Sequence, residues 1–244
     1  MDVAIITGGT RGIGGAIATA LARRKVRLVL NGRSEDDEVR TLLQGLGQLT
    51  DVRFHAGDAS EAKTSAELVD LAMSAFGRVD FAVPAAGGPN PGRATEISFD
   101  QWMDAFRVHV HAVFHLFRAA HPALAVRGGA MLMIGSVAGR RGCPATVAYQ
   151  TVKGALPQMA RALARDHAHE GIRVAVGGTA VHAHDVGRCL RDMPPVCRPL
   201  QVLVLHRNAK LLAPVRRLIA AEVVTSWREE RGQLYFRETL STRI

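Results

Sequence analysis

The chain has 244 residues and a formal net charge of +9, with 48% hydrophobic and 22% charged residues. This length suits one α/β domain with a single core, and the composition is typical of a globular protein. No apolar run approaches the roughly 20 residues of a membrane-spanning helix, and the first residues lack the features of a signal peptide. Three cysteines without a CxxC pair exclude a disulfide framework, so we expect a reducing, cytoplasmic setting.

The excess positive charge is concentrated in the last quarter of the chain. Residues 177–244 hold 11 Lys and Arg against 6 Asp and Glu, whereas residues 1–176 hold 20 against 16. A basic tail can bind nucleic acid, but this one lacks interleaved aromatic residues and any helix-turn-helix or zinc-finger spacing. We therefore expect neither a nucleic acid nor a membrane as a partner.

Short β-branched runs alternate with helical patterns up to residue 176, which predicts βαβ units around a parallel sheet. Strands are expected at 3–7, 26–30, 52–58, 79–83, 130–136 and 172–176. Helices are expected at 14–24, 66–76, 99–120 and from 147 onward, the first with Ile13, Ile17 and Leu21 buried and the second with Leu68, Leu71 and Ala72 buried. The predicted fold is a doubly wound parallel sheet in three α/β/α layers.

The pattern weakens beyond residue 176. A strand at 200–205, a helix at 209–224 interrupted by Pro214 and a short strand at 233–236 are the elements that the sequence favours there. Because no repeat or linker is present, we expect residues 1–244 to form one domain, with 177–244 as an atypical C-terminal region of it.

The motif TGGTRGIGG at residues 7–15 follows the first strand and opens the first helix. Gly8 allows a tight exit from the strand, while Gly12 and Gly14 let a pyrophosphate approach backbone amides at the positive end of the helix. A ligand-free glycine turn rarely needs three glycines at these offsets. The motif therefore predicts a dinucleotide site.

The residues after the second strand indicate which dinucleotide binds. An acid at that position would favour NAD, whereas this chain has Asn31-Gly32-Arg33, with Arg11 in the glycine loop. Two guanidinium groups near the adenosine ribose suit a 2′-phosphate, so we expect NADP(H) in preference to NAD(H). The alternative is that Arg33 is a solvated loop charge.

Together with Asp58, Ser136 and the Tyr149-x-x-x-Lys153 pair, these residues resemble the classical short-chain dehydrogenase/reductase family over residues 1–176. The resemblance implies a Rossmann-type fold, a carbonyl or secondary-alcohol substrate, and a homodimer or homotetramer. It implies Ser136, Tyr149 and Lys153 as catalytic residues. It also implies a cofactor site formed by Gly8, Thr10, Arg11, Gly12, Ile13, Gly14, Arg33, Asp58, Ala59, Ala86, Gly87, Tyr149 and Lys153.

The chemistry explains why these residue types occur together. A free phenol has a pKa of about 10, and an ammonium group one helical turn away favours the phenolate. Tyr149 can then exchange a proton with the substrate oxygen while Ser136 hydrogen-bonds that oxygen. In the family the lysine also holds the nicotinamide ribose, a role that the resemblance gives to Lys153.

Several residues depart from the family pattern. Pro84-Ala85-Ala86-Gly87 replaces Asn-Asn-Ala-Gly, and His109 stands where an asparagine anchors a water in the family's proton relay. Imidazole can donate and accept, so His109 either replaces that asparagine or marks a lost relay, and we favour the loss. Pro157 predicts a kink rather than an end in the helix that carries Tyr149.

Histidines give no convincing metal site in the sequence. His111 and His115 share a helical face but lack a third ligand, and the fragment HAHDVGRC at 182–189 has no defined context. We therefore expect no metal.

The C-terminal quarter lacks the Pro-Gly turn and the lid of the family. Divergence and a shifted reading frame in GC-rich DNA both explain its excess of Arg, His, Pro and Cys. These departures support a second hypothesis, in which the chain is a non-catalytic or impaired dinucleotide-binding relative.

Overall fold

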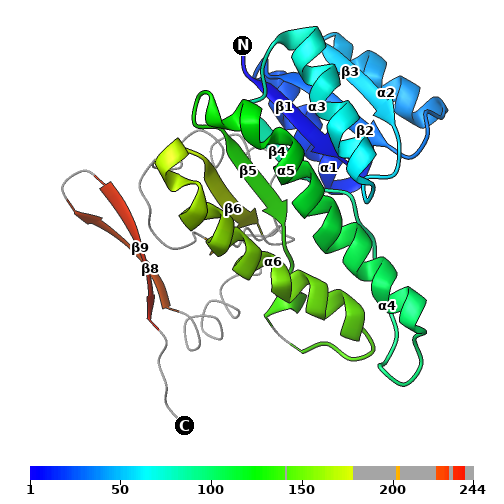
Figure 1. Cartoon of the computed structure of the whole chain (residues 1–244), viewed down its shortest axis with the longest axis vertical. Helices are drawn as coiled ribbons and strands as arrows, with labels where there is room; N and C mark the ends of the chain where they lie inside the picture. The colour runs from blue at the N-terminus through cyan, green and yellow to red at the C-terminus, as the bar shows by residue number, and fades with distance from the viewer. Residues whose placement is uncertain (141, 178–201, 204–223, 231–232, 240–244) are drawn as a thin grey trace, which may run out of the picture. The chain divides into compact units, whose positions relative to one another are not determined.

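The computed structural model of the chain describes residues 1–140, 142–177, 202–203, 224–230 and 233–239 (Figure 1). The strands of its main sheet are β1 (Val3–Thr7), β2 (Arg27–Gly32), β3 (Val52–Ala56), β4 (Phe81–Pro84), β5 (Ala130–Ile134), β6 (Arg173–Gly177) and β7 (Val202–Leu203). The α-helices are α1 (Gly12–Arg23), α2 (Asp37–Gly47), α3 (Ala62–Phe76), α4 (Phe99–Phe106), α5 (Ala112–Ala125) and α6 (Val147–Asp166). Three short turns complete this part: the π-helical η1 (Arg107–His111) and the 3₁₀ turns η2 (Val137–Gly139) and η3 (Ala168–Glu170).

The strands pair in parallel in the order β3-β2-β1-β4-β5-β6-β7. The chain winds outward from β1 to β3 and then returns to place β4 on the other side of β1, with Ala4 opposite Phe81. This order confirms the doubly wound parallel sheet. Ligands of such sheets bind beyond the carboxyl ends of the strands where the winding reverses, here between β1 and β4.

Two apolar layers cover the sheet because successive strand residues point to opposite faces. Ile5 belongs to the layer that includes residues of α3, α5 and α6, and Ile6 to the layer of α1 and α2. The predicted buried stripe of α1 is correct for Ile17 and Leu21 but wrong for Ile13, which is 40% exposed. Ile13 lies in the first turn of α1, at the carboxyl edge of the sheet, where no layer covers it.

The single helix predicted at 99–120 is wrong in its centre. The structure divides it into α4, the π-helical turn η1 and α5, and the last helix extends to Ala125 through Pro122. A π turn holds an extra residue, so it resets the helical register without ending the helix. His109 lies in this turn and is only 3% exposed.

The helix α6 continues through Pro157, as predicted, to Asp166. Proline has no N–H, so it leaves the carbonyl of Lys153 without its intrahelical donor. Gly139 of η2 packs against that carbonyl: a Cβ added to Gly139 would lie 2.6 Å from the Lys153 oxygen. Both residues therefore affect the Lys153 carbonyl: Pro157 removes its helical donor, and Gly139 is small enough to pack against it.

The chain divides into two compact units, Met1–Leu205 and His206–Ile244. The described part of the second unit is an antiparallel hairpin of β8 (Val224–Glu230) and β9 (Gln233–Thr239). The strand predicted at 233–236 is confirmed by β9, and part of that predicted at 200–205 by β7. The helix predicted at 209–224 lies outside the described residues except for Val224, which begins β8.

The prediction of one domain over residues 1–244 stays a prediction. In the part of the chain that the structure describes, no helix combines the length and apolarity needed to cross a membrane.

Candidate functional site

The glycine loop lies where the winding of the sheet reverses, between the carboxyl ends of β1 and β4. The N–H of Ala85 donates to the Thr7 carbonyl (3.1 Å), and the N–H of Ala86 lies 3.5 Å from the Thr7 hydroxyl. A Cβ added to Gly8 would lie 2.7 Å from the Cα of Ala86. The loop after β4 therefore packs against the glycine loop through backbone contacts, although it lacks the asparagines of the family.

The first turn of α1 has the features of an anion site. Gly12 has φ +54° and no atom within 4 Å of an added Cβ, so its surroundings are open. Gly14, in contrast, has no space for a side chain, because an added Cβ would lie 2.1 Å from the Gly8 carbonyl oxygen. The helix has no side-chain cap and no acidic residue in its first turn, whereas α2 is capped by Asp36. Its exposed amides are therefore available to a pyrophosphate, and this part of the site fits a dinucleotide.

The two arginines expected at the ribose differ in their surroundings. Arg11 forms ion pairs with Asp36 and, at 2.9 Å, with Glu38. Arg33 is exposed and makes no hydrogen bond or ion pair with any residue that the structure describes. An anion would therefore have to displace two paired carboxylates from Arg11, whereas Arg33 has no direct ion pair to give up among the described residues.

Asp58 lies in the turn after β3, and Ala59 beside it is buried. The N–H of Ser60 donates to the Asp58 carboxylate at 2.8 Å. This bond, aided by the charge of Arg33, lowers the pKa of Asp58 below its usual value despite partial desolvation. Asp58 is therefore a negative charge with acceptor capacity left over, suited to an amino group such as that of adenine.

Asn31 is a structural residue of this edge whose role the sequence did not reveal. Its buried amide donates to the carbonyls of Gly57 (2.9 Å) and His55 (3.2 Å), and its own carbonyl accepts from Gly9 (3.0 Å). The side chain of Asn31 thus holds the turn that carries Asp58, while its backbone carbonyl holds the glycine loop. Close packing continues at Gly32, where an added Cβ would lie 2.8 Å from the Thr10 hydroxyl.

Ser136, Tyr149 and Lys153 lie around the carboxyl end of β5. Ser136 follows β5, and its hydroxyl oxygen accepts from the Ala138 N–H at 3.2 Å. Lys153 is buried, its ammonium donates to the Ile134 carbonyl at 2.8 Å, and it lies 5.7 Å from the centre of the Tyr149 ring. Burial lowers the pKa of Lys153 to about 8. The structure therefore brings the end of β5 and one turn of α6 together as the family motif requires.

His109 lies against Tyr149, with its ring edge-on and the ring centres 5.6 Å apart. Its Nε2 is 3.0 Å from the Gly88 carbonyl and 3.1 Å from Asn90 Oδ1. Burial, aided by the charge of Lys153, lowers the pKa of His109 to about 4, so the ring is neutral at pH 7. Since both neighbours of Nε2 are acceptors, Nε2 carries the proton, and the buried Nδ1 is an acceptor without a partner among the described residues.

The ring of His109 also restricts the loop after β4. A Cβ added to Gly87, whose φ is +155°, would lie 2.5 Å from the His109 ring. Any side chain at position 87 would therefore collide with the His109 ring, so this ring position requires glycine there.

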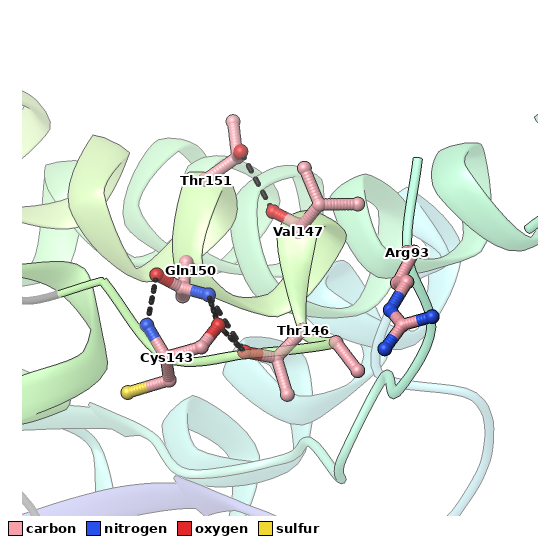
Figure 2. Close-up of a pocket in the computed structure, with 7 residues that line it drawn as sticks. Arg93, Cys143, Thr146, Val147, Gln150 and Thr151 are labelled. Carbon is pink, nitrogen blue, oxygen red and sulfur yellow. Dashed lines mark hydrogen bonds between the residues drawn. The ribbon is translucent and has the colours of Figure 1, made fainter. Parts of the chain in front are cut away.

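A hollow of about 350 Å³ lies on the outer side of α6 (Figure 2). Val147, Gln150 and Thr151 line it from the helix face turned away from Tyr149. The Gln150 amide accepts from the Cys143 N–H (2.9 Å) and donates to the Thr146 hydroxyl (2.7 Å). The lining of this hollow includes neither Tyr149 nor Lys153, and Gln150 fixes the loop that precedes α6.

The family model for short chain dehydrogenases matches residues 2–188. The chain is 31% identical over 174 residues to elsinochrome reductase 1 of Elsinoe fawcettii, with 70% of this chain and 65% of that protein covered. It is 34% identical over 176 residues to the dehydrogenase/reductase SDR family member 4 of Caenorhabditis elegans, with 70% and 67% covered. The chain thus spans about two thirds of the length of these relatives, and the family model extends 12 residues past the residue 176 at which the sequence resemblance was placed.

Solved structures agree with this match. An alcohol dehydrogenase of the archaeon Thermococcus sibiricus, complexed with 5-hydroxy-NADP, has a TM-score of 0.73 and 28% identity, with 84% of this chain and 95% of that chain covered. The L-sorbose reductase of Gluconobacter frateurii, complexed with NADPH and L-sorbose, has a TM-score of 0.69 and 27% identity, with 72% and 68% covered. The chain therefore belongs to the short-chain dehydrogenase family.

Proposed function

We propose that the protein is an NADP(H)-dependent oxidoreductase that interconverts a carbonyl compound and a secondary alcohol. The observation that carries the proposal is the buried ammonium of Lys153 beside the Tyr149 ring, at the end of the strand that leads into Ser136. The dinucleotide, when bound, supplies or accepts the hydride. The residues of the chain supply the proton and the orientation of the substrate.

Each of the three residues has a separate role in the proposal. Tyr149 exchanges a proton with the substrate oxygen, and Lys153 places a positive charge beside the Tyr149 ring. Ser136 Oγ already accepts from Ala138, so its O–H is available to donate to the same oxygen. The neutral Nδ1 of His109 would accept from a water behind Tyr149 and link it to solvent.

The glycine loop and its neighbours form the proposed cofactor site. The amides of Gly12 and Ile13 would bind the pyrophosphate, with Gly8, Thr10 and Gly14 shaping the turn. Asp58 and Ala59 would contact the adenine, Ala86 and Gly87 the nicotinamide side, and Lys153 the ribose.

The preference for NADP(H) rests on Arg33 and Arg11. We expect Arg33→Ala to lower kcat/KM for NADPH by about tenfold or more while changing that for NADH little, since one charged hydrogen bond contributes about 1.5–3 kcal/mol. Glu38→Gln removes one competitor of Arg11 and should raise kcat/KM for NADPH. A wild-type preference for NADH would disprove the NADP(H) assignment without affecting the reaction type.

The reaction itself is tested with Tyr149→Phe. We expect unchanged NADPH binding by fluorescence titration and a loss of ketone reduction of about 10²–10⁴-fold. Tyr235→Phe, at the only other tyrosine of the chain, is the matched control and should retain activity. Binding without turnover of any ketone in a broad panel would favour the non-catalytic relative instead.

We also propose a small-molecule substrate, a cytoplasmic location and a homodimer or homotetramer. The family supports the first and the last. Sedimentation equilibrium that shows a monomer at micromolar concentration would contradict the oligomer.

A further inference from the structure

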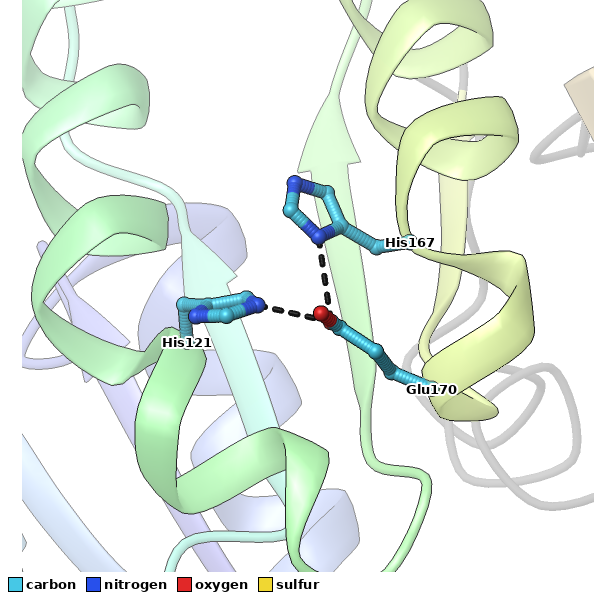
Figure 3. A group of neighbouring side chains, drawn as sticks. All are labelled: His121, His167 and Glu170. Carbon is cyan, nitrogen blue, oxygen red and sulfur yellow. Dashed lines mark hydrogen bonds and ion pairs between the residues drawn. The ribbon is translucent and has the colours of Figure 1, made fainter.

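Two histidines and a glutamate converge at the edge of the sheet opposite to the glycine loop (Figure 3). His121 lies on α5, His167 follows α6, and Glu170 ends η3, directly before β6. Since β6 begins at Arg173, this is the amino edge of the parallel sheet. The cluster is therefore separate from the proposed dinucleotide site at the carboxyl edge.

Both imidazoles are directed at a single carboxylate oxygen. Nε2 of His121 is 2.7 Å and Nδ1 of His167 is 3.0 Å from Oε2 of Glu170. Their ring centres are 4.6 Å apart, and both rings contact Phe117, at 5.9 and 5.0 Å. Phe117 is buried, so it supports the two rings from the protein interior.

The side chains of all three residues are 24–30% exposed, so an ion can reach them from solvent. Among the residues that the structure describes, no other group of three ligating side chains converges in this way.

We infer that His121, His167 and Glu170 form a binding site for one divalent transition-metal ion. Ligand atoms at about 2.1 Å from a metal are separated by about 3.0 Å at a right angle and by about 3.4 Å in a tetrahedron. The observed separations of 2.7 and 3.0 Å therefore need to open by at most about 0.3 Å for a right angle and by about 0.4–0.7 Å for a tetrahedron. The two ring nitrogens lie within 4.8 Å of each other, so one ion can reach both after a small rotation of the rings. The ion takes the place of the proton on each of these two nitrogens: in a neutral ring that proton moves to the other ring nitrogen, and an imidazolium releases it to water.

The donor set determines which ions bind. Two imidazole nitrogens and one carboxylate oxygen suit Zn²⁺, Ni²⁺, Co²⁺ and Cu²⁺, whereas Mg²⁺ and Ca²⁺ prefer sites made of oxygen ligands alone. His169 can supply a further ligand, since its Nε2 lies 3.7 Å from the other Glu170 oxygen, Oε1. Water completes the coordination otherwise.

A metal at this position would stabilise the fold without taking part in the reaction. It would join α5 to the turn between α6 and β6, two segments 46 residues apart in the chain. At a hundredfold excess over its Kd, an ion that binds only the folded protein raises Tm of a chain of this size by about 5–10 °C.

The test is Zn²⁺ titration of the untagged, chelator-treated full chain by calorimetry, together with Tm in Zn²⁺ and in EDTA. We expect one tight site, a Tm increase with Zn²⁺ and none with Mg²⁺. His121→Asn, His167→Asn and Glu170→Gln should each weaken Zn²⁺ binding at least about tenfold. His55→Asn is the matched control, because it breaks a His–Glu pair of 3.1 Å that has no second histidine.

Each outcome decides the proposal. Absent Zn²⁺ binding, or tight binding that none of the three variants weakens, would overturn it. If one variant is unfolded in EDTA, the remaining two still test the site, and the visible spectrum of bound Co²⁺ reports directly whether nitrogen ligands are present.

Discussion

Two buried ionisable side chains meet beside Tyr149, and both are displaced from their ordinary pKa. Lys153 titrates at about 8 instead of 10.5, and His109 at about 4 instead of 6.5, each mainly because burial disfavours its charged form. The fold therefore holds a charged ammonium and a neutral imidazole side by side at pH 7. At neutral pH the Tyr149 ring therefore has a cation on one neighbouring side chain and an uncharged hydrogen-bonding group on another.

The stability of the protein should fall in acid because His109 is buried in its neutral form. Its folded-state pKa is depressed, so its contribution to stability is present above pH 6.5 and is lost as the pH falls toward 4. Between these values we expect the free energy of unfolding to fall by up to about 3 kcal/mol more in the wild type than in His109→Asn. Urea unfolding at half-unit pH steps measures this difference, and parallel curves would contradict the buried neutral ring.

Raising the pH should stabilise the protein through Lys153, whereas lowering it destabilises the protein through His109. The ammonium is costly to bury, and this cost disappears as the pH rises from about 8 to 10.5, where the unfolded chain alone holds the extra proton. We therefore expect the stability of the wild type relative to Lys153→Met to increase by up to about 3 kcal/mol across this interval. A constant difference between the two proteins would show that the ammonium is solvated.

At the scale of elements, the turn from β1 to α1 is set by backbone contact rather than by side chains. We expect Gly14→Ala to destabilise the protein by about 1–3 kcal/mol, because its Cβ would meet the Gly8 carbonyl, and to weaken NADPH binding. Gly45→Ala in α2 is the control: nothing lies within 4 Å of its Cβ, so it should stabilise by about 0.5–1 kcal/mol. Equal unfolding midpoints for the two variants would contradict this account.

Much of the carboxyl edge of the sheet could be predicted from the sequence, because the residues concerned are close together along the chain. Gly8, Gly12 and Gly14 follow a strand directly, and Tyr149 and Lys153 are one helical turn apart, so spacing alone defines their arrangement. Asn31 could not be recognised, because its partners lie at Gly57 and His55 and are set by the pairing of β2 with β3.

Features of the helices that depend on packing between distant segments could not be predicted either. The π turn around His109 leaves the apolar pattern of residues 99–120 continuous, so periodicity gave no sign of it. His121, His167 and Glu170 share no local motif and meet only because α5 and α6 pack on one face of the sheet.

At the scale of the main folding unit, Asp80 joins the two halves of the sheet at its amino edge. Its carboxylate accepts from the Val3 N–H (2.8 Å) and from Nε and Nη2 of Arg78 (2.8 and 2.5 Å), and Asp80 is 7% exposed. We expect Asp80→Ala to cost about 1–3 kcal/mol, because it leaves the buried Val3 N–H without an acceptor and Arg78 with only its 3.7 Å pair with Asp2. Asp70→Ala, at an exposed position of α3, should change the unfolding free energy little, and similar losses in both variants would argue against the role of Asp80.

The pairing of β1 with β4 has a consequence for the order of folding. Ala4 and Phe81 are 77 positions apart, so this contact closes a long loop and carries a large entropic cost in the transition state. The glycine loop and its covering segment after Pro84 meet only when this closure is complete. A chain that has formed the β1–β2–β3 half alone therefore has no dinucleotide site, and acquisition of cofactor affinity during refolding should coincide with the slow, non-local step.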